Sequence, residues 1–140
     1  MKPFVLWCAI FCGVYAGLST AYHLFLSRHP RRVVVAVDAS FPMQAVWSQV
    51  PEALATIQTQ RYTLFSLITD KASIHSWQPR LALGALQPYA PRALSHLLDR
   101  NRSPELAVAD QVYVITNATD RTALATDIRW RLVPLQPPAP

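Results

Sequence analysis

An uncharged apolar segment near the amino terminus constrains this chain more than any other feature. Residues 4–26 contain no Asp, Glu, Lys or Arg over 23 positions. A helix rises about 1.5 Å per residue, so a segment of this length is long enough to cross the hydrocarbon core of a bilayer. We therefore assign residues 1–27 to an N-terminal transmembrane anchor.

A cleaved signal peptide is the alternative interpretation of this segment. The small residues at 19–21 (Ser-Thr-Ala) offer a place where a signal peptidase could cut. The apolar run is longer than a usual signal core, however, and it continues through residues 22–26 beyond that place. We expect an uncleaved signal-anchor that holds the protein in the cell membrane by a single pass.

Small residues recur at a spacing of four within the segment, at Gly13, Gly17 and Ala21. Small side chains let two helix backbones approach closely, which favours association of helices in lipid. We expect this face to pack against transmembrane helices of a partner. Glycine is also common in membrane helices that have no such contact, so both interpretations stay open.

The positive charge of the chain is concentrated beside the anchor. Thirteen Lys and Arg against eight Asp and Glu give a net charge of +5, and residues 28–32 (RHPRR) form a basic juxtamembrane linker. Because the other basic residues are scattered, attraction to the lipid bilayer explains the net positive charge better than binding to nucleic acid. The positive-inside rule slightly favours a cytoplasmic position for the rest of the chain.

The composition of the remaining residues excludes several kinds of catalytic site. Both cysteines, Cys8 and Cys12, lie in the anchor, so the soluble part has no disulfide, cysteine nucleophile or cysteine metal site. A single glycine there, Gly84, leaves no Gly-rich phosphate loop. His75 and His96 are isolated, and no nucleophile motif surrounds a serine. We predict that the protein is not an enzyme; a small enzyme of unrecognised type is an alternative.

Periodicity in the soluble part predicts alternating strands and helices. The expected strands are residues 33–37, 62–69, 73–77, 111–116 and 128–133, and the expected helices are 43–57, broken at Pro51, and 92–100. The second and third strands should form a hairpin. The order predicts an α/β domain over residues 33–133, with a small open, mostly parallel sheet and helices on both faces. Residues 134–140 should form a proline-rich tail that packs little.

Polar residues follow two of the buried strands directly. Asp38 ends the run VVVAV, and Thr116 and Asn117 end QVYVIT. In open α/β sheets, ligands bind beyond the carboxyl ends of strands, where the strand order reverses. If the two strands are neighbours, these polar residues converge on one site.

The motifs at these positions resemble those of von Willebrand factor A (vWA) domains. Residues 38–43 (DASFPM) resemble the family's Asp-x-Ser-x-Ser-Met, residues 112–118 (VYVITNA) resemble its later strand ending in Thr-Asp-Gly, and the hairpin at 62–77 fits the family order. The resemblance covers most of residues 32–133. It implies a vWA or Rossmann-like sheet and a metal-ion-dependent adhesion site, where oxygen ligands hold Mg²⁺.

The chain departs from this family in its metal ligands. Pro42 stands at the second serine, Asn117 stands at the second Asp, and residues 79–91 contain no threonine to supply the middle-loop ligand. A hard divalent cation prefers several charged oxygen donors. We therefore expect no metal and no cofactor, with Asp38 and Ser40 as weak candidates for Mg²⁺. Capping of the helix near residue 43 is the other expected role of these two side chains.

These observations together predict a membrane-anchored protein-interaction module, an assembly factor or accessory subunit of a membrane protein complex. Its expected partner-binding surface consists of Asp38, Ser40, Thr116 and Asn117. The alternative from another class is a vWA domain that binds its ligand through Mg²⁺. The two are distinguished by whether a divalent cation binds.

Overall fold

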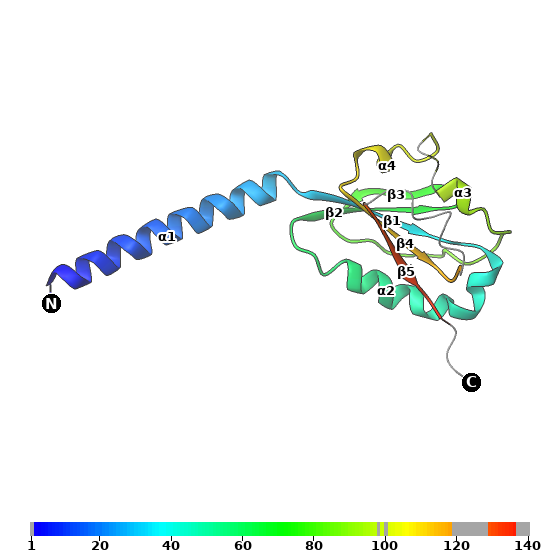
Figure 1. Cartoon of the computed structure of the whole chain (residues 1–140), viewed down its shortest axis with the longest axis horizontal. Helices are drawn as coiled ribbons and strands as arrows, with labels where there is room; N and C mark the ends of the chain where they lie inside the picture. Colours follow the sequence, from blue (N-terminus) through cyan, green and yellow to red (C-terminus); the bar gives the residue numbers. More distant parts are fainter. Residues whose placement is uncertain (1, 98, 100, 119–128, 137–140) are drawn as a thin grey trace. The chain divides into compact units, whose positions relative to one another are not determined.

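The computed structural model describes residues 2–97, 99, 101–118 and 129–136 (Figure 1). The chain divides into two compact units, residues 1–30 and residues 31–140. This division falls inside the basic linker expected at residues 28–32.

The amino-terminal unit is one helix, α1 (Lys2–Arg28). Its apolar stretch has a mean hydropathy of 1.8 and no part of it is buried. The hydroxyls of Thr20 and Ser27 donate to the carbonyls of Ala16 (2.8 Å) and Leu24 (2.9 Å), so these polar groups are satisfied within the helix. The predicted apolar helix is confirmed: α1 is long and apolar enough to span a membrane, as a signal sequence also can be.

The second unit is built on one mixed sheet with the strand order β3-β2-β1-β4-β5 (Figure 1). The strands of the described chain are β1 (Arg31–Val37), β2 (Thr63–Thr69), β3 (Ser73–Gln78), β4 (Gln111–Thr116) and β5 (Trp130–Pro134). β2, β1, β4 and β5 run parallel, whereas β3 pairs antiparallel with β2 at one edge. The predicted α/β class, the mostly parallel sheet and the hairpin are confirmed.

Strand β1 is apolar at every position from 33 to 37 because both faces of the sheet are covered. Successive side chains of a strand point to opposite faces. Val33, Val35 and Val37 join the core on one face, and Val34 and Ala36 join the core on the other. All five are buried. The covered part of the strand has no solvent-facing position for a polar residue. Polar residues occur only at its exposed start, Arg31 and Arg32, and directly after its carboxyl end.

One face of the sheet is covered by η1 (Phe41–Gln49), a 3₁₀ helix, and α2 (Val50–Ile57) (Figure 1). The prediction for this stretch was a helix interrupted at Pro51. The α-helix does restart there, because Pro51 lies in the first turn of α2, where its missing N–H leaves no intrahelical bond unmade. Met43 of η1 and Leu54 of α2 are buried against the sheet.

The other face carries two short helices, α3 (Leu94–Leu97) and α4 (Glu105–Val108). The predicted helix over residues 92–100 is therefore too long at its start, and residues 98 and 100 lie outside the described residues. Arg92 precedes α3, and its side chain reaches Asp38 at the end of β1. Helix α4 was not predicted, since four residues are too few to show a helical period.

Strand β5 corresponds to the strand expected at 128–133, and residue 128 lies outside the described residues. It occupies an edge of the sheet, and Arg131 is exposed. The chain after residue 133 packs more than expected. Leu135 is buried and its N–H donates to the carbonyl of Thr116 (3.0 Å), while Nε2 of Gln49 donates to the carbonyl of Gln136 (2.8 Å). Residues 137–140 lie outside the described part.

Candidate functional site at the carboxyl edge of the sheet

The carboxyl ends of β1, β2 and β4 lie level at one edge of the sheet. In the strand register, Val37 is opposite Thr69 on one side and Ile115 on the other. Asp38 and Thr116 follow directly, and the prediction that they converge is confirmed. Because β2 and β4 lie on opposite sides of β1, this edge is the point where the strand order reverses, the usual place of a ligand site in such sheets.

The carboxylate of Asp38 is fully buried and held by hydrogen bonds from two elements. Its Oδ2 accepts a hydrogen bond from Oγ1 of Thr116 (2.8 Å), and its Oδ1 accepts one from the backbone N–H of Ser40 (3.0 Å). The N–H of Asp38 donates in turn to the carbonyl of Ile115 (3.0 Å). A buried charge still needs an opposite charge, and these bonds do not supply one.

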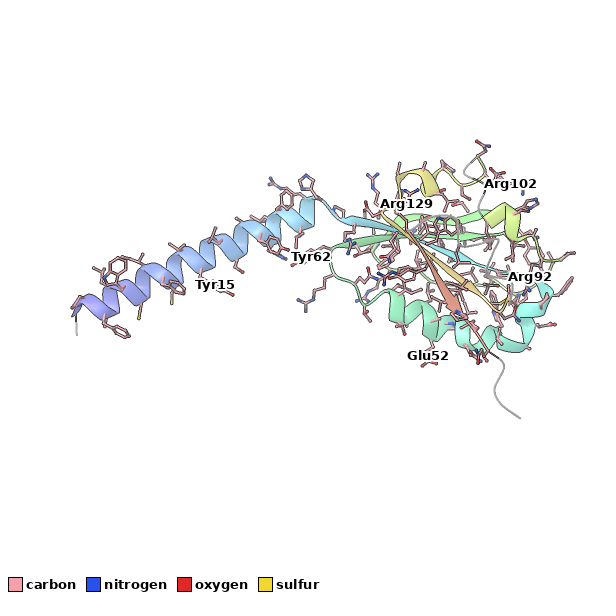
Figure 2. The ribbon with its side chains drawn as sticks, viewed as in Figure 1. Tyr15, Glu52, Tyr62, Arg92, Arg102 and Arg129 are labelled. Atoms are coloured by element: carbon pink, nitrogen blue, oxygen red, sulfur yellow. The ribbon has the colours of Figure 1, made fainter. Side chains whose placement is uncertain are left out.

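Arg92, which is labelled in Figure 2, supplies that charge. Its Nε lies 3.0 Å from Oδ2 of Asp38 and 3.3 Å from Oγ of Ser40, and its Nη2 donates to Oδ1 of Asn117. The arginine side chain is 28% exposed, whereas the aspartate is not exposed at all. Sequence analysis missed Arg92 because it lies in an irregular, proline-rich stretch and has no fixed spacing to the Asp38 motif.

Asn117 connects this ion pair to the start of η1. Its Oδ1 accepts from Arg92, its Nδ2 donates to the carbonyl of Pro42 (2.6 Å), and its backbone N–H points to the sulfur of Met43 (3.2 Å). An amide can accept and donate at the same time, whereas an ionised carboxylate can only accept. The asparagine therefore fits this position, where an aspartate would leave the Pro42 carbonyl without its donor.

Two sequence-based roles of these residues are corrected by the structure. Asp38, Ser40 and Thr116 are fully buried, so they cannot themselves form a contact surface; Asn117 alone of the four is partly exposed. The expected helix capping is also absent. Ser40 precedes η1 but its side chain makes no capping bond, and its carbonyl accepts the N–H of Met43 (2.9 Å) instead.

The residues at this edge do not fit a magnesium ion. Within the described residues, no group of three His, Cys, Asp or Glu side chains could hold a metal. The oxygens nearest to the family pattern, on Asp38, Ser40 and Asn117, accept hydrogen bonds from Arg92. The guanidinium thus occupies the position that a cation would need, and Pro42 contributes no oxygen from its side chain.

Two exposed aromatic side chains lie on segments that pair beside the buried network. Phe41 is 53% exposed and Tyr89 is 57% exposed. The N–H of Phe41 donates to the carbonyl of Ala90 (2.9 Å), and the N–H of Tyr89 donates to the carbonyl of Ala39 (3.1 Å). Neither aromatic was predicted as a site residue. Both side chains are thus exposed on the two backbone segments that contain Ser40 and precede Arg92.

The small residues of α1 are exposed along the helix. Gly13, Gly17 and Ala21 have exposed positions, and a Cβ added at either glycine would meet no described atom within 4 Å apart from its chain neighbours and the backbone of its own helix. The expected helix-packing face is therefore open within the described chain.

Comparisons of the chain with protein-family models, with curated proteins and with solved structures found no match. A functional proposal therefore rests on the arrangement of side chains at the carboxyl edge of the sheet and on the apolar composition of α1.

Proposed function

We propose that this protein is a single-pass membrane-anchored interaction module, acting as an assembly factor or accessory subunit of a membrane protein complex. In this proposal α1 spans the cell membrane and the sheet domain binds a protein partner. The partner contacts a surface formed by Phe41, Tyr89 and Asn117 around the partly exposed Arg92. We refer to these four side chains as the edge surface.

The membrane part of the proposal is supported by α1. An apolar helix of this length that buries none of its side chains would expose a large apolar surface to water, and a bilayer removes that surface from water. Arg28, Arg31 and Arg32 follow at its carboxyl end, where they would meet anionic lipid head groups. Their number against the single Lys2 favours a cytoplasmic sheet domain. The glycine face of α1 would pack against partner helices.

We further propose that the sheet domain is a truncated vWA-like domain with a degenerate metal site. The support is the Asp-x-Ser motif directly after β1, the antiparallel hairpin of β2 and β3, and Thr116 at the end of the neighbouring β4. Here the bond network around Asp38 is closed by an arginine of the same chain. It does not depend on a bound cation, so partner binding is expected without one.

The proposal of protein binding rests on the exposure and the residue types of the edge surface. Large aromatic side chains and arginine are the residues most enriched at the energetic centres of protein interfaces. Phe41 and Tyr89 each expose more than half of their surface, and Arg92, three residues after Tyr89 in the chain, is fixed by bonds to Asp38 and Asn117. Side chains that are already ordered lose less conformational entropy when a partner binds.

The test is co-purification of the full chain from detergent-solubilised membranes. The double substitution Phe41→Ser and Tyr89→Ser should lower the yield of a specifically bound membrane protein about tenfold or more, as expected for interface centres worth more than about 1.4 kcal/mol. Val108→Ser is the matched control, because Val108 is 48% exposed but lies on α4. This control should leave the yield unchanged.

Two results would contradict the proposal. If the double variant and the Val108→Ser control retain the partner equally, the edge surface is not the interface. If calorimetry on the full chain shows Mg²⁺ binding that Asp38→Ala abolishes, the metal-dependent alternative replaces the proposal. In that case the cation must displace Arg92 from Asp38.

A further inference from the structure

Four exposed arginines lie at the amino end of the sheet, opposite to the carboxyl edge that Arg92 occupies. Arg31 and Arg32 begin β1. Arg61 lies two residues before β2, and Arg80 lies two residues after β3. Because β3 runs antiparallel to β2, its last residues return to the amino end of β2. We refer to Arg31, Arg32, Arg61 and Arg80 as the arginine end of the sheet.

Backbone pairing between neighbouring strands brings these arginines to one level. Arg31 is opposite Thr63 in the strand register. Its N–H donates to the carbonyl of Tyr62 (2.9 Å), the residue directly after Arg61. Figure 2 shows Tyr62 at this end of the sheet and Arg92 at the opposite end. The arginine end is therefore a part of the folded sheet domain and extends beyond the basic linker at residues 28–32.

The charges of the arginine end are not neutralised by described carboxylates. None of its four guanidinium groups forms an ion pair with a described Asp or Glu. Asp110 precedes β4, and its Oδ2 accepts the backbone N–H of Arg32 (2.8 Å). The guanidinium of Arg32 lies over the ring of Trp77, 5.8 Å from its centre. Four positive charges thus face solvent with one nearby negative charge.

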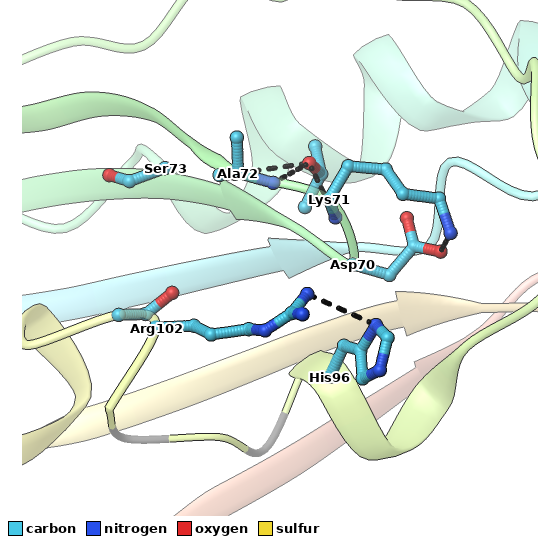
Figure 3. Close-up of a pocket in the computed structure, with 8 residues that line it drawn as sticks. Asp70, Lys71, Ala72, Ser73, His96 and Arg102 are labelled. Carbon is cyan, nitrogen blue, oxygen red and sulfur yellow. Dashed lines mark hydrogen bonds and ion pairs between the residues drawn. The ribbon is translucent and has the colours of Figure 1, made fainter.

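Basic side chains at the carboxyl end of the sheet have internal partners instead. Nζ of Lys71 lies 2.7 Å from Oδ2 of Asp70 (Figure 3). Nε of Arg92 lies 3.0 Å from Oδ2 of Asp38. The two ends of the sheet therefore differ, because these bases at the carboxyl end form ion pairs within the chain and the arginine end can accept anions from outside it.

The chain connects this same end of the sheet directly to α1. Two residues, His29 and Pro30, separate Arg28 at the end of α1 from Arg31 at the start of β1. Even a fully extended connection of this length spans only about 10 Å. When α1 spans a bilayer, Arg31 therefore stays within about 10 Å of the carboxyl end of α1, where the lipid head groups lie.

We propose that the arginine end docks on anionic lipid head groups of the bilayer that α1 spans. The carboxyl edge of the sheet then faces away from the lipid, where a partner can reach the edge surface. This inference rests on the proposed membrane span of α1 and adds the surface by which the sheet domain meets the lipid. Guanidinium groups suit phosphate oxygens, since they donate two parallel hydrogen bonds. The half-buried Trp77 beneath Arg32 also suits an interface, where tryptophan is enriched.

Fluorescence quenching on the full chain in lipid nanodiscs tests the docking. In a background with Cys8→Ser and Cys12→Ser, a fluorophore is attached to Gln78→Cys or to Ala72→Cys, two exposed positions at opposite ends of β3. The two sites are roughly 20 Å apart along the strand. The quencher is a nitroxide on a lipid head group.

Addition of phosphatidylglycerol to phosphatidylcholine nanodiscs should raise quenching of the Gln78→Cys label about twofold or more and leave the Ala72→Cys label nearly unchanged. Sodium chloride should reverse the gain, because salt screens exposed charges.

Single substitutions test which arginines hold the lipid. Arg61→Gln and Arg80→Gln should each lower the ratio of docked to undocked protein about fivefold, which corresponds to about 1 kcal/mol per arginine near an anionic surface. Arg102→Gln is the matched control, because Arg102 is also exposed but lies beside the turn at the carboxyl end of β2. This control removes the same charge and should leave the ratio unchanged.

Co-elution of the chain with the nanodisc separates this inference from the proposed span. A chain that co-elutes but shows equal quenching of the Gln78→Cys label in both lipid mixtures overturns the docking and leaves the span in place. If Arg102→Gln lowers quenching as much as Arg61→Gln, net charge alone attracts the domain, and the arginine end is not the docking surface. A chain that does not co-elute contradicts the span itself, and the docking with it.

Discussion

At the scale of single residues, Arg92 determines what the carboxyl edge of the sheet can do. A buried carboxylate at a strand end needs a positive partner, and in this chain the partner is a side chain 54 positions away. The guanidinium reaches two acceptors at once, with Nε on Asp38 and Nη2 on Asn117. A lysine has a single nitrogen and cannot reproduce this fork. The side chains at this edge are therefore held in place by bonds within the chain.

We predict that Arg92→Met lowers the free energy of unfolding by roughly 3 kcal/mol, the lower end of the range for leaving one buried partner of an ion pair uncompensated. The lower end applies because Arg92 is partly exposed and Asp38 keeps its bonds to Thr116 and Ser40. Urea unfolding of the full chain in detergent, followed by tryptophan fluorescence, measures the change.

The exposed Arg80 provides the control for this experiment, and Arg80→Met should change stability by less than about 0.5 kcal/mol. Arg92→Lys should recover less than half of the loss, because it keeps the charge but not the fork. Equal stability of the Arg92→Met and Arg80→Met variants would show that the pair contributes nothing to folding.

At the scale of elements, α3 and α4 are helices that tertiary contacts hold in place. Four residues form too few backbone hydrogen bonds to offset the cost of starting a helix. Each contributes one buried leucine to the core on the face of the sheet that the two helices cover, Leu97 from α3 and Leu106 from α4. The same two helices carry His96, which bonds to Arg102, and Glu105, which accepts a hydrogen bond from Ser73. Core packing therefore positions these polar groups.

We predict that Leu97→Ala lowers the free energy of unfolding by about 2–5 kcal/mol, the usual range for removing a fully buried leucine side chain. Ser95→Ala on the exposed side of the same helix is the control and should stay within about 0.5 kcal/mol of the natural chain. Equal effects of the two substitutions in urea unfolding would mean that α3 is not held by its core contact.

At the scale of the whole molecule, sequence analysis succeeded where long patterns carry the information. The unbroken apolar run of β1 predicted a strand covered on both faces, and its position beside β4 brought Asp38 to Thr116 as expected. Arg92 was not predictable, because an irregular connection carries it to β1 and no periodicity specifies where such a connection runs.

The orientation of the whole chain is the last property that the sequence predicts and an experiment can decide. Arg28, Arg31 and Arg32 outnumber Lys2 across α1, so we predict that the sheet domain is cytoplasmic. Replacing Cys8 and Cys12 by serine gives a background without thiols. In that background a cysteine at the exposed Ser76 position of β3 should react with a membrane-impermeant maleimide only after cells are permeabilised.

The reciprocal variant, Pro3→Cys at the other end of α1, should react in intact cells, because a single pass places the two ends on opposite sides of the membrane. Labelling of the Ser76→Cys variant in intact cells would reverse the orientation. Loss of the Pro3→Cys label together with a mature chain about 20 residues shorter by mass would show a cleaved signal peptide, with a cut near residues 19–21. The partner would then be sought on the far side of the membrane, with the edge surface still available to it.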